Sequence, residues 1–298
     1  MTSEDIQETM IKAAADLISE ETPNYQLVAG RLITYHLRKQ VYGQFEPPVL
    51  KEIVDANIAN DMYDPLLKKW YSEKEFDQLE KWIDHKRDEN YTYAAMEQFR
   101  GKYLVQDRFT KKVYETPQVA LMLIGATLFH NYPKETRMQW VKDFYDSVSR
   151  FEISLPTPVM AGVRTSIRQF SSCVLIESGD SLDSINATSA AIVKYVSKRA
   201  GIGVGGGNIR AVGSSINGGH ATHTGVIPFY KHFQSAVRSC SQGGVRGGAA
   251  TLYYPIWHYE VEDLLVLKNN KGTEDNRISH IDYGVQCIIV IYECLMNG

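Results

Sequence analysis

The residues best suited to chemistry lie in one stretch, residues 168–182, which contains a cysteine, several serines and an aspartate. Residues 170–176 are mostly apolar or β-branched and predict a buried strand with Cys173 in its middle. A Gly-Asp-Ser turn follows, at the strand end where α/β folds bind their ligands. Cys173 could be a redox thiol at this site or an ordinary buried cysteine.

A redox role for Cys173 requires a second thiol, with the two Cα atoms roughly 4.4–6.8 Å apart. Cys240 lies in a glycine-rich segment beyond a predicted helix, and Cys287 and Cys294 lie near the end of the chain. None of the three is an obvious partner. We therefore expect any redox partner of Cys173 to belong to another chain.

Residues 201–206 match the G-x-G-x-x-G spacing of a dinucleotide-binding turn, which requires a strand before it and a helix after it. Here a helix is expected before the glycines and a loop after them, which argues against such a turn. Two interpretations remain. The glycines could let a substrate approach the backbone closely, or they could form a tightly packed strand inside a barrel.

Other polar patterns are weaker. His220 and His223 have the spacing of a metal-binding pair, but no third ligand is near, so we expect a loop and no metal. Residues 239–251 place glycines around Gln242 and Arg246, as in a loop that bends around a base or phosphate or in a plain surface loop.

Asp180, Ser181 and Leu182 could cap the following helix or bind a ribose hydroxyl, and one geometry could allow both.

The elements before this site are predicted to be helical. Thr2 and Asp5 have the spacing of a capping box, and Ile6, Met10 and Leu17 lie on one apolar helix face. Residues 103–114 predict a short hairpin. Helices are predicted at residues 2–20, 27–41, from 47, 73–84, 116–129 and 132–148.

From residue 153 onward, predicted strands and helices alternate, which favours a parallel sheet or barrel. Strands are expected at residues 170–176, 252–257 and 276–286, and helices at 183–198, 229–237 and 261–267. A complete eight-stranded barrel needs roughly 250 residues, and parallel sheets are normally covered on both faces. We therefore expect part of a barrel that something else completes. Residues 287–298 are apolar and β-prone.

Composition adds broad limits. The chain has 298 residues, 44% hydrophobic and 22% charged, with a net charge of −3, so no nucleic-acid or membrane-surface partner is indicated. No apolar run approaches the roughly 20 residues of a membrane helix, and the acidic N-terminus does not resemble a signal peptide. The cysteine pattern is typical of the cytoplasm, where we expect the protein to be.

Long blocks of this sequence resemble the large, catalytic subunit of class I ribonucleotide reductase. The order and spacing of the blocks match that family from near the first residue to residue 286. The matching blocks are residues 42–48, 155–158, 168–185, 199–203, 239–251 and 264–270.

The resemblance implies a helical N-terminal domain followed by the first part of a ten-stranded α/β barrel. By this resemblance, residues 1–43 are a remnant of the ATP-cone and N-terminal helices, and 44–152 the helical domain. Residues 153–286 would be the first half of the barrel, and 287–298 a tail outside the family. The implied reaction is radical reduction of ribonucleoside diphosphates to deoxyribonucleotides.

Site residues also follow from the resemblance. Cys173 resembles the cysteine that donates electrons to the substrate and becomes half of a disulfide. Thr157, Ser172 and Gly201 resemble substrate contacts. The effector-nucleotide site would contain Asp180, Ser181, Leu182, Arg210 and Ile216. The loop that reports effector identity to the substrate base would contain Gln242 and Arg246.

The resemblance implies no cofactor bound by this chain, a nucleoside diphosphate substrate, and dNTP or ATP effectors. A metal-containing small subunit would supply the radical, and thioredoxin or glutaredoxin the electrons, to a large-subunit dimer. Lys39 resembles a nucleotide-contacting lysine of the ATP-cone, whose other contacts are absent, so control by ATP and dATP is expected to be lost or crippled.

The thiyl cysteine and the second disulfide cysteine of the family are also absent from this sequence. We therefore expect the chain to be inactive alone and to need a second chain that carries them. The alternatives are a non-catalytic deoxynucleotide-binding regulator of a reductase and an inactive truncation product.

Overall fold

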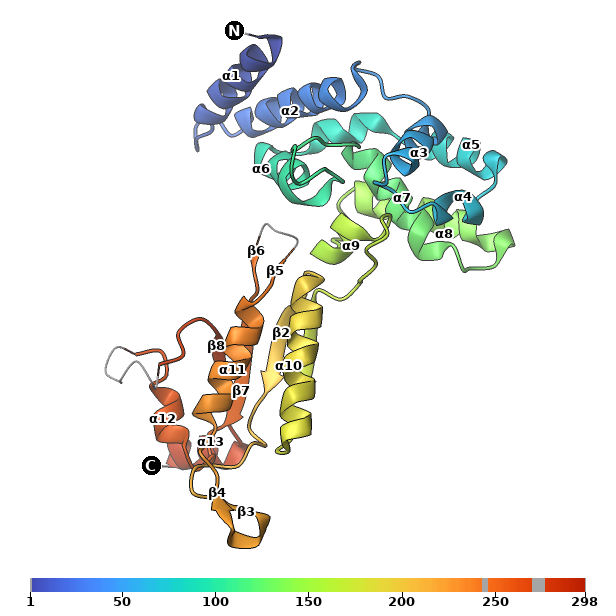
Figure 1. Ribbon diagram of the computed structural model, residues 1–298. Coiled ribbons are helices and arrows are strands. Elements are labelled where there is room, and N and C mark those ends of the chain that lie inside the picture. Colours follow the sequence, from blue (N-terminus) through green and yellow to red (C-terminus); the bar gives the residue numbers. More distant parts are fainter. Residues whose placement is uncertain (1, 243–245, 270–276, 298) are drawn as a thin grey trace. The chain divides into compact units, whose positions relative to one another are not determined.

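The computed structural model describes residues 2–242, 246–269 and 277–297. The chain divides into two compact units, residues 1–170 and 171–298, each with its own hydrophobic core. The first unit is helical and the second contains a parallel sheet (Figure 1). This confirms the predicted fold class, a helical N-terminal domain followed by the start of an α/β barrel.

Most predicted helices of the first unit are present, with ends shifted by a few residues. Two short irregular helices, η1 (His85–Asn90) and η2 (Phe99–Tyr103), complete the unit. The α-helices are α1 (Ser3–Asp16), α2 (Tyr25–Tyr42), α3 (Leu50–Ala59), α4 (Leu66–Trp70), α5 (Glu73–Trp82), α6 (Tyr93–Gln98), α7 (Pro117–Phe129), α8 (Lys134–Ser149) and α9 (Thr157–Gly162).

Local sequence signals explain several helix ends. The Thr2 hydroxyl accepts from Asp5 N at 3.2 Å, and the Asp5 carboxylate accepts from Thr2 N at 2.6 Å, as predicted for a capping box. Helix α2 ends at Gly43, whose positive φ of 71° lets its N–H reach the Lys39 carbonyl at 2.9 Å. Caps of this kind satisfy backbone groups that helix ends leave without partners.

Helix α7 forms the centre of the first unit. Every residue from Pro117 to Thr127 is buried, as expected for a helix that is apolar on all sides. A Cβ atom on Gly125 would lie 3.0 Å from the Phe144 ring of α8, so the two helices pack closely at this point.

The apolar face predicted for α1 is wrong. Ile6, Met10 and Leu17 are 47%, 51% and 52% exposed, whereas Ile11 and Ala14 are buried. Helix α1 packs on α2 through this narrower stripe, so the periodicity located the helix but not its contact face. The hairpin predicted at residues 103–114 is reduced to a single bridge between Gln106 and Val113.

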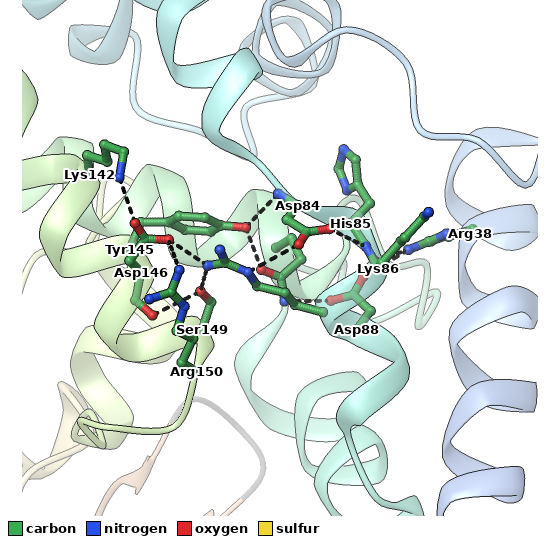
Figure 2. A network of polar contacts seen from close by, with 12 residues as sticks. Arg38, Asp84, His85, Lys86, Asp88, Lys142, Tyr145, Asp146, Ser149 and Arg150 are labelled. Carbon is green, nitrogen blue, oxygen red and sulfur yellow. Dashed lines mark hydrogen bonds and ion pairs between the residues drawn. The ribbon is translucent and has the colours of Figure 1, made fainter.

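A buried polar network links η1 to α2, α7 and α8 (Figure 2). Asp88 is fully buried, with its Oδ1 atom accepting from Gln118 Nε2 at 3.0 Å and its Oδ2 atom 3.5 Å from Arg38. Tyr145 donates its hydroxyl proton to Gln118 at 2.7 Å and accepts from Asp84 N at 2.9 Å. The network therefore fixes four segments to one another.

Burial perturbs two titratable groups in this region. Burial raises the pKa of Asp88 to about 7, although the Gln118 hydrogen bond and the Arg38 charge oppose the rise. Burial lowers the pKa of His85 to about 4, and the nearby Arg38 charge adds to that decrease. The two groups therefore respond to pH in opposite directions.

A second buried charge cluster holds the segment that follows α9. Arg164 and Glu115 form an ion pair with both side chains fully buried. Arg164 also donates to the Met160 carbonyl of α9 at 2.6 Å, and Glu115 accepts from the Tyr63 hydroxyl at 2.5 Å. These bonds fix α9 to the body of the first unit.

In the second unit, four parallel strands form a sheet in the order β1-β2-β7-β8. These strands are β1 (Cys173–Glu177), β2 (Gly201–Gly205), β7 (Ala250–Pro255) and β8 (Asp282–Gln286). The helices are α10 (Leu182–Ser197), α11 (Ile227–Arg238), α12 (Val261–Leu265), α13 (Ile289–Asn297) and the short η3 (Asn217–Gly219). Two small antiparallel pairs join β3 (Ser215–Ile216) to β4 (Ala221–Thr222) and β5 (Ser241–Gln242) to β6 (Arg246–Gly247).

The two faces of this sheet differ in burial. One face carries Val204 and Leu252, is buried, and packs against α10 and α11, which run alongside the strands (Figure 1). The other, which we call the open face, carries Cys173, Leu175 and Tyr253. Leu175 and Tyr253 are 82% and 45% exposed. Parallel sheets are normally covered on both sides, so the open face is unusual.

The last described residues were expected to be β-prone, but they form helix α13, and none of its residues is buried. Leu295 and Met296 are 75% and 86% exposed. Short apolar runs do not distinguish strand from helix by periodicity alone, which explains the wrong expectation. Within the described residues, no helix is both long and apolar enough to cross a membrane.

Candidate functional site

The first group of predicted site residues meets where β1 begins. Cys173 is the register partner of Gly201, and Gly201 N donates to the Ser172 carbonyl at 2.7 Å. The Ser172 hydroxyl lies 3.7 Å from Cys173 Sγ, and a Cβ on Gly201 would lie 3.9 Å from the same sulfur. The structure therefore brings Ser172, Cys173 and Gly201 together.

Two details of the Cys173 prediction are wrong. Cys173 is the first residue of β1, not the middle of a longer strand, and it is exposed. Alternation along β1 turns Val174 and Ile176 toward the buried side and Cys173 to the open face. All four cysteines lie within the described residues and are free thiols. Cys173 is therefore an accessible thiol and not a core residue.

The glycines after α10 form strand β2, which excludes a dinucleotide-binding turn between a strand and a helix. Side chains of β1 lie over them. A Cβ on Gly203 would lie 2.5 Å from the Leu175 side chain, so glycine leaves room for that side chain on the open face. The interpretation as a tightly packed glycine strand is therefore supported.

Thr157 belongs to the other unit, where it is the exposed first residue of α9. Its helix is fixed to the first unit by the Arg164–Glu115 pair. The expected contact of Thr157 with the substrate stays a prediction.

The second group of site residues surrounds the turn after β1. Asp180 Oδ1 accepts from Arg210 N at 2.8 Å, and Asp180 Oδ2 accepts from Arg210 Nε at 2.5 Å. Burial alone would raise the pKa of Asp180, but the hydrogen bonds and charge of Arg210 outweigh it and lower that pKa. Arg210 also donates to the Ser215 carbonyl at 2.9 Å, next to Ile216.

Ser181 and Leu182 begin helix α10. The Ser181 hydroxyl accepts from Ser184 N at 3.2 Å, which confirms its predicted role as an N-cap. Leu182 is 67% exposed and offers an apolar surface beside the Asp180 turn. Arg210 therefore links the Asp180 turn to the strand of Ile216, and Ser181 and Leu182 follow Asp180 directly at the start of α10.

Residues 239–251, expected as a loop, contain the hairpin β5–β6, in which Gln242 and Arg246 are paired across the strands. Residues 243–245 lie outside the described residues. The hairpin leads into β7 after two residues.

The His220–His223 pair does not gather ligands. His223 Nδ1 accepts from Gly225 N at 3.1 Å, and its ring stacks on Phe229. Throughout the part of the chain that the structure describes, no three His, Cys, Asp or Glu side chains are placed to hold a metal ion.

Comparison with known proteins identifies the family. The ribonucleotide reductase barrel domain family matches residues 171–297, and the ribonucleotide reductase all-alpha domain family matches residues 89–168. The chain belongs to the ribonucleotide reductase large-subunit family. The barrel match includes most of residues 287–298, which we expected to lie outside the family.

Individual relatives agree. The chain is 64% identical over 294 residues to ribonucleoside-diphosphate reductase 1 subunit alpha of Escherichia coli K12, covering 99% of this chain and 39% of that protein. It is 61% identical over 298 residues to the reductase subunit alpha of Buchnera aphidicola from Acyrthosiphon pisum, covering 100% of this chain and 39% of that protein. This chain therefore spans about two fifths of the length of these relatives.

A solved structure supports the fold. The Actinobacillus ureae class Id ribonucleotide reductase alpha subunit aligns with a TM-score of 0.56 at 21% identity, over 73% of this chain and 36% of that one. At this identity the similarity concerns the fold alone.

Sequence reasoning missed polar residues that hold the second group in place. Glu177, at the end of β1, accepts from Asn208 Nδ2 at 2.7 Å. His258 and Glu260, just beyond β7, are buried and contact the backbone of residues 209–226. All three acids and bases lie at or beyond the C-terminal ends of predicted parallel strands. That position was the available signal.

The region of Lys39 forms a pocket of about 550 Å³ in the first unit. Its lining includes Gln7, His36, Lys39, Lys111 and Lys112. Burial lowers the pKa of His36, although the Glu8 carboxylate opposes the decrease. The pocket is therefore lined by lysines and by His36, whose charged form is disfavoured by burial.

Proposed function

We propose that this chain is the N-terminal part of a ribonucleoside-diphosphate reductase large subunit, which reduces ribonucleotides to deoxyribonucleotides by radical chemistry. The observation that carries the proposal is the exposed thiol of Cys173 on the open face, beside Ser172 and Gly201, in a chain of this family. An accessible thiol on a barrel strand is suited to giving electrons to a bound substrate.

Cys173 supplies one half of a two-electron donor. Two thiols that form a disulfide release two electrons and two protons, which reduce a carbon–oxygen bond to a carbon–hydrogen bond with loss of water. The second thiol, and the thiyl that abstracts the ribose hydrogen, belong in this proposal to a second chain that carries the rest of the large subunit. The single chain is then inactive.

The open face supports this dependence on a partner. Leu175 and Tyr253 expose apolar surface that a completed barrel would enclose. Strands β1 and β8 also leave edges that could pair with further strands. We propose that the completing chain covers this face and pairs at one or both edges.

The remaining groups have regulatory roles in the proposal. A dNTP effector binds at the site formed by Asp180, Ser181, Leu182, Arg210 and Ile216. Gln242 and Arg246 report the identity of that effector to the substrate base.

The proposal also includes partners. A small subunit supplies the radical, thioredoxin or glutaredoxin re-reduces the enzyme, and the large subunits dimerise in the cytoplasm. The Lys39 pocket belongs to a remnant of the ATP-cone in which control by ATP and dATP is lost or crippled.

The test is reconstitution. The chain is mixed with a chain that carries the C-terminal part of a reductase large subunit and with a radical-loaded small subunit, and cytidine diphosphate reduction is measured. We expect activity only from the complete mixture, and loss of activity in Cys173→Ser. Cys240→Ser is the matched control and should remain active. Reductase activity from the single chain would refute the proposed dependence.

A second function is favoured by the preformed contact between Asp180 and Arg210. In this alternative, the chain binds deoxynucleotides without catalysing a reaction and regulates an intact reductase. The same mixture distinguishes the two. Tight dNTP binding together with no activity and no association with the completing chain would favour the regulator.

A further inference from the structure

Two polar residues beyond β7 contact the segment that carries the proposed effector residues. His258 and Glu260 are 8% and 7% exposed, so both are buried although both are polar. Buried polar side chains need hydrogen-bond partners, and among the described residues the partners of these two side chains are backbone groups. The positions of those backbone groups reveal what the two side chains do.

Glu260 joins the two ends of one loop. Its Oε2 atom accepts from Val212 N at 2.9 Å and from Val226 N at 3.1 Å. The loop between these residues contains Ile216. Gly225 has a φ of 94°, and a Cβ there would lie 2.6 Å from Glu260 Oε1, so glycine is required for this close approach. One carboxylate oxygen therefore fixes the width of the loop at its base.

His258 adds a third attachment. Its Nε2 lies 3.0 Å from the Ile209 carbonyl, and its Nδ1 accepts from Glu260 N at 3.1 Å. A carbonyl can only accept and a backbone N–H can only donate, so in this arrangement Nε2 carries the ring proton and Nδ1 is the acceptor. The ring thus orients the backbone at Glu260 and also holds the backbone of Ile209, the residue before Arg210.

The same segment is held from its other side by β1 and its turn. Asn208 donates to Glu177, and Arg210 N donates to Asp180. Residues 208–212 therefore lie between the C-terminal ends of β1 and β7. At its N-terminal end, β7 continues from the hairpin strand β6 with only Gly248 and Ala249 between them.

We propose that His258 and Glu260 are positioning residues that couple the Ile216 loop to β7, and through β7 to the hairpin of Gln242 and Arg246. The inference rests on the proposed effector role of the Asp180 turn. The inference identifies His258 and Glu260 as the residues through which a nucleotide bound at the Asp180 turn affects the conformation of the hairpin. The coupling needs no contact between Glu260 and the nucleotide, because the loop backbone lies between them.

The test compares Glu260→Ala with Glu260→Gln in the full chain. The glutamine carbonyl oxygen can accept both loop N–H groups, so this variant should keep the attachment, whereas alanine removes it. Hydrogen exchange is measured by mass spectrometry with and without dTTP, together with dTTP affinity by calorimetry.

In the wild-type chain and in Glu260→Gln, we expect dTTP to slow exchange in peptides covering both residues 211–226 and 246–255. In Glu260→Ala, we expect faster exchange in residues 211–226 and loss of the dTTP effect in 246–255. His258→Phe keeps an aromatic ring but removes its hydrogen bonds, and it serves as a second variant, with circular dichroism reporting the fold.

Two results would overturn the inference, and they differ. If the wild-type chain binds none of the four dNTPs, the proposed effector site is wrong and the coupling is wrong with it. If dTTP binds and still slows exchange in residues 246–255 of Glu260→Ala and His258→Phe, the effector site stands and only the coupling is wrong.

Discussion

Helix α7 of the first unit and strand β1 of the second are both rich in apolar residues, but their surroundings differ. In α7 every residue from Pro117 to Thr127 is buried, and Leu123 has no exposed surface. In β1 the exposed positions alternate with half-buried ones, and Leu175 is 82% exposed. The apolar residues of α7 are therefore enclosed within the first unit, whereas Leu175 of β1 remains exposed in the second.

Because of this difference, we expect the first unit to be stable by itself and the second to gain stability when its open face is covered. Burial of apolar surface contributes roughly 25 cal/mol per Å². The largest effects of mutation are therefore expected in the first unit, and the largest effects of adding a partner in the second.

The largest expected effect comes from the buried ion pair. Glu115→Ala leaves the fully buried Arg164 guanidinium without its carboxylate, which typically costs about 3–5 kcal/mol. Urea unfolding followed by circular dichroism measures the loss. Glu73→Ala removes the exposed pair with Lys51 and is the control, with little change expected. Equal effects of the two substitutions would contradict the proposed self-sufficiency of the first unit.

A pair of leucines tests the comparison directly. Leu123→Ala opens a cavity in a closed core and should lower the free energy of unfolding by about 2–5 kcal/mol. Leu175→Ala, on the open face, should change the free energy of unfolding of the isolated chain by at most about 0.5 kcal/mol. In complex with the completing chain, Leu175→Ala should weaken association. A large cost of Leu175→Ala in the isolated chain would show that the open face is already covered.

The buried Asp88 gives the first unit a pH response. Its pKa rises from 3.8 to about 7 on folding, so the folded chain binds more protons over this range. Its contribution to stability is therefore lost as the pH rises toward 7. His85, whose pKa falls from 6.5 to about 4, acts in the opposite direction, because its contribution is lost as the pH falls toward 4.

Asp88→Asn separates the two contributions. We subtract the free energy of unfolding of the variant from that of the wild-type chain. This difference should decrease as the pH rises from about 4 to about 7 and stay constant above pH 7. Denaturant titrations at several pH values measure it. A difference that rises with pH would show that Asp88 is charged in the folded chain.

The smallest expected effect is a change in labelling rate. The exposed Cys173 should react with iodoacetamide faster than the half-buried Cys240 in the isolated chain. Adding the completing chain should slow labelling of Cys173 and leave Cys240 as the internal reference. Unchanged labelling of Cys173 in the complex would place the partner elsewhere than on the open face.

Local signals allowed much of the fold to be predicted. The Thr2 capping box depends on neighbouring residues only, and it was found from sequence, as was the start of α7 near residue 116. The contact face of α1 and the exposure of Cys173 depend on which distant elements lie nearby. Periodicity does not contain that information, so both predictions were wrong.

The site shows the same division. The Ser181 cap follows from adjacent residues, and Asp180 was placed by its position after a strand. His258 and Glu260 bind backbone atoms of residues that lie between 34 and 49 positions earlier in the chain. Backbone N–H and carbonyl groups occur at every residue, so no sequence pattern marks them as the partners of a particular side chain.

The order of the strands in the main sheet, β1-β2-β7-β8, is also their order along the chain. During synthesis each strand can therefore add to an edge that already exists, and no strand has to be inserted between two others. This order allows the sheet to grow in one direction, from β1 toward β8. A strand from another molecule that pairs with the completed four-stranded sheet can therefore join only at its edges, beside β1 or β8.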